Sequence, residues 1–137
     1  MIYMVATTEL TRAYRAALLL TASTRGAEAA VTRAIEKGCS AILRNTIVAA
    51  LDWRGPADAA SCAAPPLGWV LTLPRAQRQC FVLRVLEGLP AGRCGALLEM
   101  SPDEVNRAAA NVAAAHRALS AMLARQYDWP APAAGAA

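Results

Sequence analysis

A set of polar side chains on one predicted helix, and on the segment before it, could contact nucleic acid. The set comprises Ser101, Asn106, Arg107, Asn111 and Arg117 on the helix, with Arg75 and Arg78 earlier in the chain. Asparagine and arginine read base edges in the major groove of DNA, and arginine also binds phosphate. Side chains of these types near the start of a helix therefore form a candidate DNA-binding surface.

The residues that could support catalysis or metal binding are few and scattered. Cysteines occur at Cys39, Cys62, Cys80 and Cys94, without CxxC spacing, and His116 is the only histidine. His116 falls on an apolar helical stripe, which favours a packed histidine over a catalytic base, and no serine or cysteine has a nucleophile motif around it. We therefore expect no enzyme, no metal and no cofactor, and we expect the cysteines to be buried free thiols.

The clearest local signal is the start of the helix that carries the polar set. Ser101 and Glu104 have the spacing of a capping box, Pro102 falls at the first helical position, and Asp103 complements the helix dipole. The stripe predicted to be buried comprises Val105, Ala109, Val112, His116, Leu119 and Leu123. Gly88 is expected to end the preceding helical segment in the left-handed conformation.

Composition predicts an all-α protein. The chain has 137 residues, is rich in alanine and leucine, and has 5% aromatic residues and a formal net charge of +4. Each side of Thr72 carries seven Arg or Lys and five Asp or Glu residues, so neither half is a cationic arm. The N-terminus lacks the features of a signal peptide, and the apolar runs are too short to cross a bilayer. We therefore expect a cytoplasmic protein that does not contact membrane.

The pattern of helical segments and breaks predicts two small helical units. Residues 1–53 contain three amphipathic segments, 54–66 form a linker rich in proline, glycine and small residues, and 67–127 form a second unit. Residues 128–137 are expected to be a disordered tail. The two units are either loosely tethered or packed together around Trp69, Val70 and Leu71.

Two stretches resemble the extracytoplasmic-function group of bacterial RNA polymerase sigma factors. "LPRAQRQCFVLRVLEGLPAGRCGALLEMSPDEV" is similar to their C-terminal helix-turn-helix, called region 4, and "AYRAALLLTASTRGAEAAVTRAIEKG" is similar to the start of their region 2. The resemblance implies a divergent or degenerate member of the group, in which the N-terminal unit binds polymerase and the C-terminal unit reads promoter DNA. It also implies that the helix-turn-helix core contains Leu83, Leu86, Leu97 and Val105.

Two functions stay open at this point. The first is a sigma-like transcription protein that binds the polymerase core, promoter DNA or both. The second is a sigma mimic or accessory regulator that binds polymerase, a sigma or anti-sigma partner or a second copy of itself without reading DNA. The low number of cations on the predicted recognition helix favours the second function, and the capping box and net positive charge favour the first. Candidate protein-interface residues are Glu28, Val31, Ile35, Trp53 and Trp69, although packing is the alternative role for the tryptophans.

Overall fold

The computed structural model describes residues 2–38, 40–58 and 67–126, and these residues confirm the predicted all-α class. The elements are α1 (Ile2–Thr21), α2 (Thr24–Glu36), α3 (Ile42–Leu51), the 3₁₀ turn η1 (Gly68–Thr72), α4 (Arg75–Phe81), the π-helical turn η2 (Val82–Leu86), α5 (Ala91–Leu98) and α6 (Pro102–Gln126). The predicted tail, most of the predicted linker, Cys39 and Cys62 lie outside the described residues.

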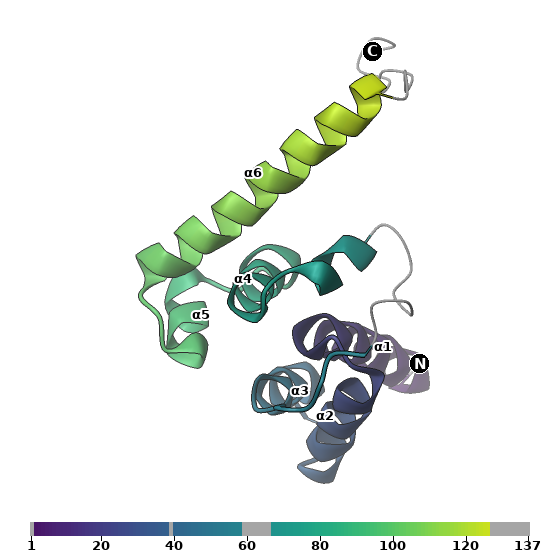
Figure 1. Ribbon diagram of the computed structural model, residues 1–137. Helices are drawn as coiled ribbons and strands as arrows, with labels where there is room; N and C mark the ends of the chain where they lie inside the picture. Colours follow the sequence, from purple (N-terminus) through teal and green to yellow (C-terminus); the bar gives the residue numbers. More distant parts are fainter. Residues whose placement is uncertain (1, 39, 59–66, 127–137) are drawn as a thin grey trace.

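Helices α1, α2 and α3 pack into a small bundle through alanine-rich faces (Figure 1). Ala13, Ala17 and Ala30 are completely or almost completely buried, and such small side chains allow helix axes to approach closely. Helix α2 begins at Thr24 because the Gly26 N–H donates to Ser23 Oγ at 3.0 Å and Ser23 thereby caps the helix.

The two halves of the chain share one hydrophobic core. Leu20 of α1 and Ile47 of α3 belong to the same buried cluster as Val70, Leu83 and Val105. An ion pair also joins the halves, because Arg12 Nη2 of α1 lies 3.2 Å from the carboxylate of Glu87. The halves are therefore packed together in this structure, and the η1 segment with Val70 and Leu71 is part of their contact.

Helix α4 widens into a π-helical turn before the chain reverses at Gly88. The Glu87 N–H donates to the Val82 carbonyl at 2.9 Å, which closes a loop five residues long instead of four. Gly88 has φ +71°, which is the left-handed conformation expected of it. The reversal allows α5 to pack against the end of α4 and the start of α6.

Helix α6 runs out from the body of the protein, and only its first half lies beside α4 and α5 (Figure 1). Val105, Ala109 and Val112 are buried as predicted. The prediction that Leu119 and Leu123 are also buried is wrong, because 47% and 43% of their surfaces are exposed. The stripe continues with helical periodicity, and Trp69 of η1 stacks on His116, but Leu119 and Leu123 beyond it stay exposed.

Candidate functional site

The site centres on the turn between α5 and α6, where three residues connect the two helices. Glu99 adopts the left-handed conformation with φ 58°, and the Met100 N–H donates to the Gly95 carbonyl at 2.9 Å. Gly95 is buried, and a Cβ at this position would collide with the Met100 carbonyl oxygen. The turn can therefore lie directly on α5 only because residue 95 has no side chain.

The predicted capping box is present and complete. The Glu104 N–H donates to Ser101 Oγ at 3.1 Å, and the Ser101 N–H donates to Glu104 Oε1 at 3.3 Å. These reciprocal bonds satisfy backbone donors that the first turn of a helix otherwise leaves unpaired. Because the cap uses both side chains, Ser101 is a positioning residue for α6 in this structure.

The exposed face of α6 carries four of the predicted DNA-binding residues: Asn106, Arg107, Asn111 and Arg117. Asn106 Oδ1 accepts a hydrogen bond from Arg84 Nε at 3.1 Å, and Arg84 also donates to the Leu89 carbonyl. Sequence reasoning missed Arg84, because it precedes Asn106 by 22 positions and no local pattern pairs them.

Arg78 is buried, whereas the prediction places it on an exposed DNA-binding surface. It is 7% exposed, and its guanidinium donates to the carbonyls of Leu73 and Leu20 at 3.0 and 3.4 Å. Burial lowers its pKa, with a smaller contribution from the nearby charge of Arg75. Leu20 lies at the end of α1, so Arg78 places a cation at a helix C-terminus, where backbone carbonyls carry partial negative charge.

Arg75 likewise places a cation at the C-terminus of α3, because its Nη2 donates to the Leu51 carbonyl oxygen at 3.1 Å. The guanidinium of Arg54 donates to the same carbonyl at 3.3 Å. Partial burial lowers the pKa of Arg75, and the charge of Arg54 lowers it further. Both predicted arginines of α4 therefore connect the halves of the chain, although Arg75 stays exposed at the surface.

The electrostatics at the start of α6 oppose contact with a polyanion. Glu99, Asp103 and Glu104 are exposed there, and Arg107 is the nearest cation along the helix. A DNA phosphate at this helix terminus would face three carboxylates, which counteract the favourable helix dipole. The second half of α6 differs in charge, because it carries Arg117 and Arg125 and no acidic residue.

The predicted protein-interface residues lie in two different environments. Glu28 and Ile35 are exposed on α2, and Val31 is half-buried between them. The two tryptophans instead pack inside the fold. The Trp53 ring lies against Gly26 and Gly55, and the Trp69 ring stacks on His116 of α6 with ring centroids 3.9 Å apart.

His116 and the two described cysteines are held in packing positions. Trp69 covers one face of the imidazole, and His116 Nδ1 is buried without a hydrogen-bond partner in the structure. Cys80 and Cys94 are buried free thiols, as predicted, and burial raises the pKa of both. Within the described ranges, no group of three or more histidine, cysteine and acidic side chains is arranged to hold a metal ion.

The described residues thus define an all-helical protein in which α4 and its π-helical turn pack onto α1 of a three-helix bundle and also contact the helix pair α5–α6. Comparison of the chain with family models, curated proteins and solved structures yields no match. In the part of the chain that the structure describes, no helix combines the length and apolar character that crossing a membrane requires. An assignment of function therefore depends on the residues and geometry described above.

Proposed function

We propose that this chain is a sigma-like regulator of bacterial transcription that acts through protein contacts and does not read DNA. The observation that carries the proposal is the exposed apolar face on the projecting half of α6. Leu119, Met122 and Leu123 lie on this face at helical spacing, with 43 to 52% of each residue exposed. Between residues 112 and 126 the charged residues are Arg117 and Arg125, and this segment contains no carboxylate. This chemistry suits an amphipathic helix with acidic flanks on a partner protein.

The connection to transcription comes from the resemblance of two stretches of the sequence to sigma regions 2 and 4. The proposal is supported by the capping box of α6, the short turn before it and the buried residues Leu83 and Val105, which the resemblance assigns to a helix-turn-helix core. Few cations lie on α6 to bind phosphate, and three carboxylates lie near the helix start. A buried helical core combined with a surface poor in cations suits a helix-turn-helix used for protein contacts.

Binding to purified bacterial core RNA polymerase, to its sigma factors and to anti-sigma proteins tests this proposal, with complexes detected by light scattering after size exclusion. We expect a complex with one of these proteins that Leu119→Asp weakens. Ala121→Asp is the matched control, because it places the same charge on the opposite face of the same helix. Absence of any complex, or equal effects of the two variants, would overturn the proposal.

The second candidate function is promoter binding through α6. It is favoured by the exposure of Asn106, Arg107 and Asn111 on the first half of this helix. Fluorescence anisotropy with labelled promoter duplexes separates the two functions. Sequence-specific binding near physiological salt, lost in Asn106→Ala and Arg107→Ala, would establish DNA reading and contradict our first proposal.

A further inference from the structure

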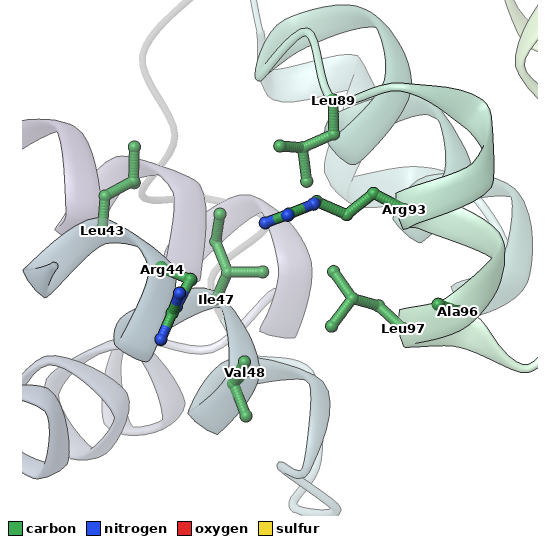
Figure 2. Close-up of a pocket in the computed structure, with 8 residues that line it drawn as sticks. All are labelled: Leu43, Arg44, Ile47, Val48, Leu89, Arg93, Ala96 and Leu97. Atoms are coloured by element: carbon green, nitrogen blue, oxygen red, sulfur yellow. The ribbon is translucent and has the colours of Figure 1, made fainter.

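An apolar groove lies between the two halves of the chain, with α3 as one wall and α5 with the residue Leu89 before it as the other (Figure 2). Leu43, Ile47 and Val48 line it from α3, and Leu89 and Leu97 line it from the opposite side. The groove has a volume of about 520 Å³. This volume lies within the roughly 300–1,000 Å³ that is typical of small-molecule sites, which are likewise lined mostly by apolar side chains.

Two arginines, one on each wall, supply the polar chemistry of the groove. Figure 2 shows Arg93 extending from α5 toward α3, and Arg44 beside Ile47 on the facing wall. Both side chains are exposed, and neither guanidinium has an ion pair or hydrogen bond among the described residues. No carboxylate lines the groove. Two unpaired guanidinium groups beside apolar walls are complementary to an apolar molecule that carries an anion.

The length of the walls distinguishes a small molecule from a helical partner. The helical lining residues span 43–48 on α3 and 93–97 on α5, which corresponds to roughly 6–8 Å along each helix, and Leu89 adds to the second wall just before α5 begins. A docked helix that uses anchors at i, i+3, i+4 and i+7 needs about 10 Å or more of continuous wall. The groove is therefore short for a helix and suits a compact or flexible apolar group.

We propose that this groove binds an amphiphilic carboxylic acid, with its apolar chain against Leu43, Val48 and Leu97 and its carboxylate at Arg93, whose guanidinium extends across the groove, while Arg44 adds positive charge on the facing wall. Guanidinium groups pair with carboxylates through two parallel hydrogen bonds, which gives both orientation and affinity. The ligand contacts α3 and α5 together, so its binding stabilises the packing of the two halves. This inference does not depend on the proposed function in transcription.

Decanoate is the probe for this site, used below the concentration at which it forms micelles and followed by isothermal titration calorimetry. Decanol, with the same chain and no charge, and butyrate, with the same charge and a short chain, are the matched ligands. We expect saturable binding of one decanoate per chain, and binding of either matched ligand that is weaker by about ten-fold or more.

Variants on the two walls test the assignment of residues. Arg93→Gln should weaken decanoate binding about ten-fold and Arg44→Gln should weaken it less, whereas Val48→Asp should weaken it more than either by placing a carboxylate in the groove. Arg33→Gln on α2 removes an exposed arginine outside the groove and should leave binding unchanged. Circular dichroism of each variant checks that the helices are intact, and all of these positions are exposed.

Three results would overturn the proposal. The first is the absence of saturable decanoate binding to the intact chain. The second is equal affinity for decanol and decanoate, or binding that is insensitive to the arginine variants. The third is binding of an acidic amphipathic helical peptide at Arg93 in place of decanoate, which would assign the groove to a protein partner.

Discussion

Replacing Gly95 with alanine should destabilise the protein, whereas the same replacement at Gly92 of the same helix should not. A Cβ at Gly95 would collide with the carbonyl oxygen of Met100, a backbone atom that cannot move without displacing the α5–α6 turn. A Cβ at Gly92 meets no atom within 4 Å. Both replacements gain about 0.5–1 kcal/mol from the helix propensity of alanine, so the steric collision is the main difference between them.

The size of the expected destabilisation follows from the steric collision at Gly95, which Gly92 lacks. Overpacking a closely packed site costs about 1–3 kcal/mol, so Gly95→Ala should unfold about 1–3 kcal/mol more easily than Gly92→Ala. Urea titration followed by circular dichroism measures this difference as a lower denaturation midpoint at unchanged slope. Equal stability of the two variants, or a more stable Gly95→Ala protein, would refute the close approach of the turn to α5 and with it our account of how α6 is positioned.

Three further predictions concern the cap, the core and the thiols. Ser101→Ala should lower the free energy of unfolding by about 1 kcal/mol, measured by urea titration, because the Glu104 N–H loses its acceptor. Leu83→Ala should cost about 2–5 kcal/mol because Leu83 is fully buried, while Val85→Ala, at a residue 48% exposed, should cost much less in the same assay. Burial raises the pKa of Cys80 and Cys94, so above about pH 8.5 the unfolded chain loses thiol protons that the folded chain retains. The free energy of unfolding should therefore fall as pH rises through this range, and the Cys94→Ala variant should show a smaller fall.

Part of the candidate site could be predicted because the relevant interactions are local. The capping box joins residues three positions apart, and both of its hydrogen bonds form as the pattern indicates. Gly88 adopts its left-handed conformation at the end of a helical segment, where such a conformation favours glycine. The sequence places these features correctly because each depends on backbone groups within one helical turn.

The role of the α4 arginines could not be predicted in this way. Arg75 and Arg78 lie near a helix start, where cations are compatible with phosphate binding, yet each donates to the last turn of a helix in the other half. Their partners, Leu51 and Leu20, lie 24 and 58 positions away. Whether these arginines bind phosphate or cap a helix depends on which helix ends the tertiary structure brings next to α4.

The sequence by itself determined the all-helical class, the start of α6 and its apolar stripe, because helix propensity, capping and periodicity act over a few neighbouring residues. Only the tertiary structure decided which part of the stripe is buried. Val105 and Leu123 fit the same periodic pattern, but α4 and α5 lie against the first half of α6 and do not reach the second. The groove with Arg44 and Arg93 arises for the same reason, since its walls are two helices far apart in the sequence that meet only when the halves pack together.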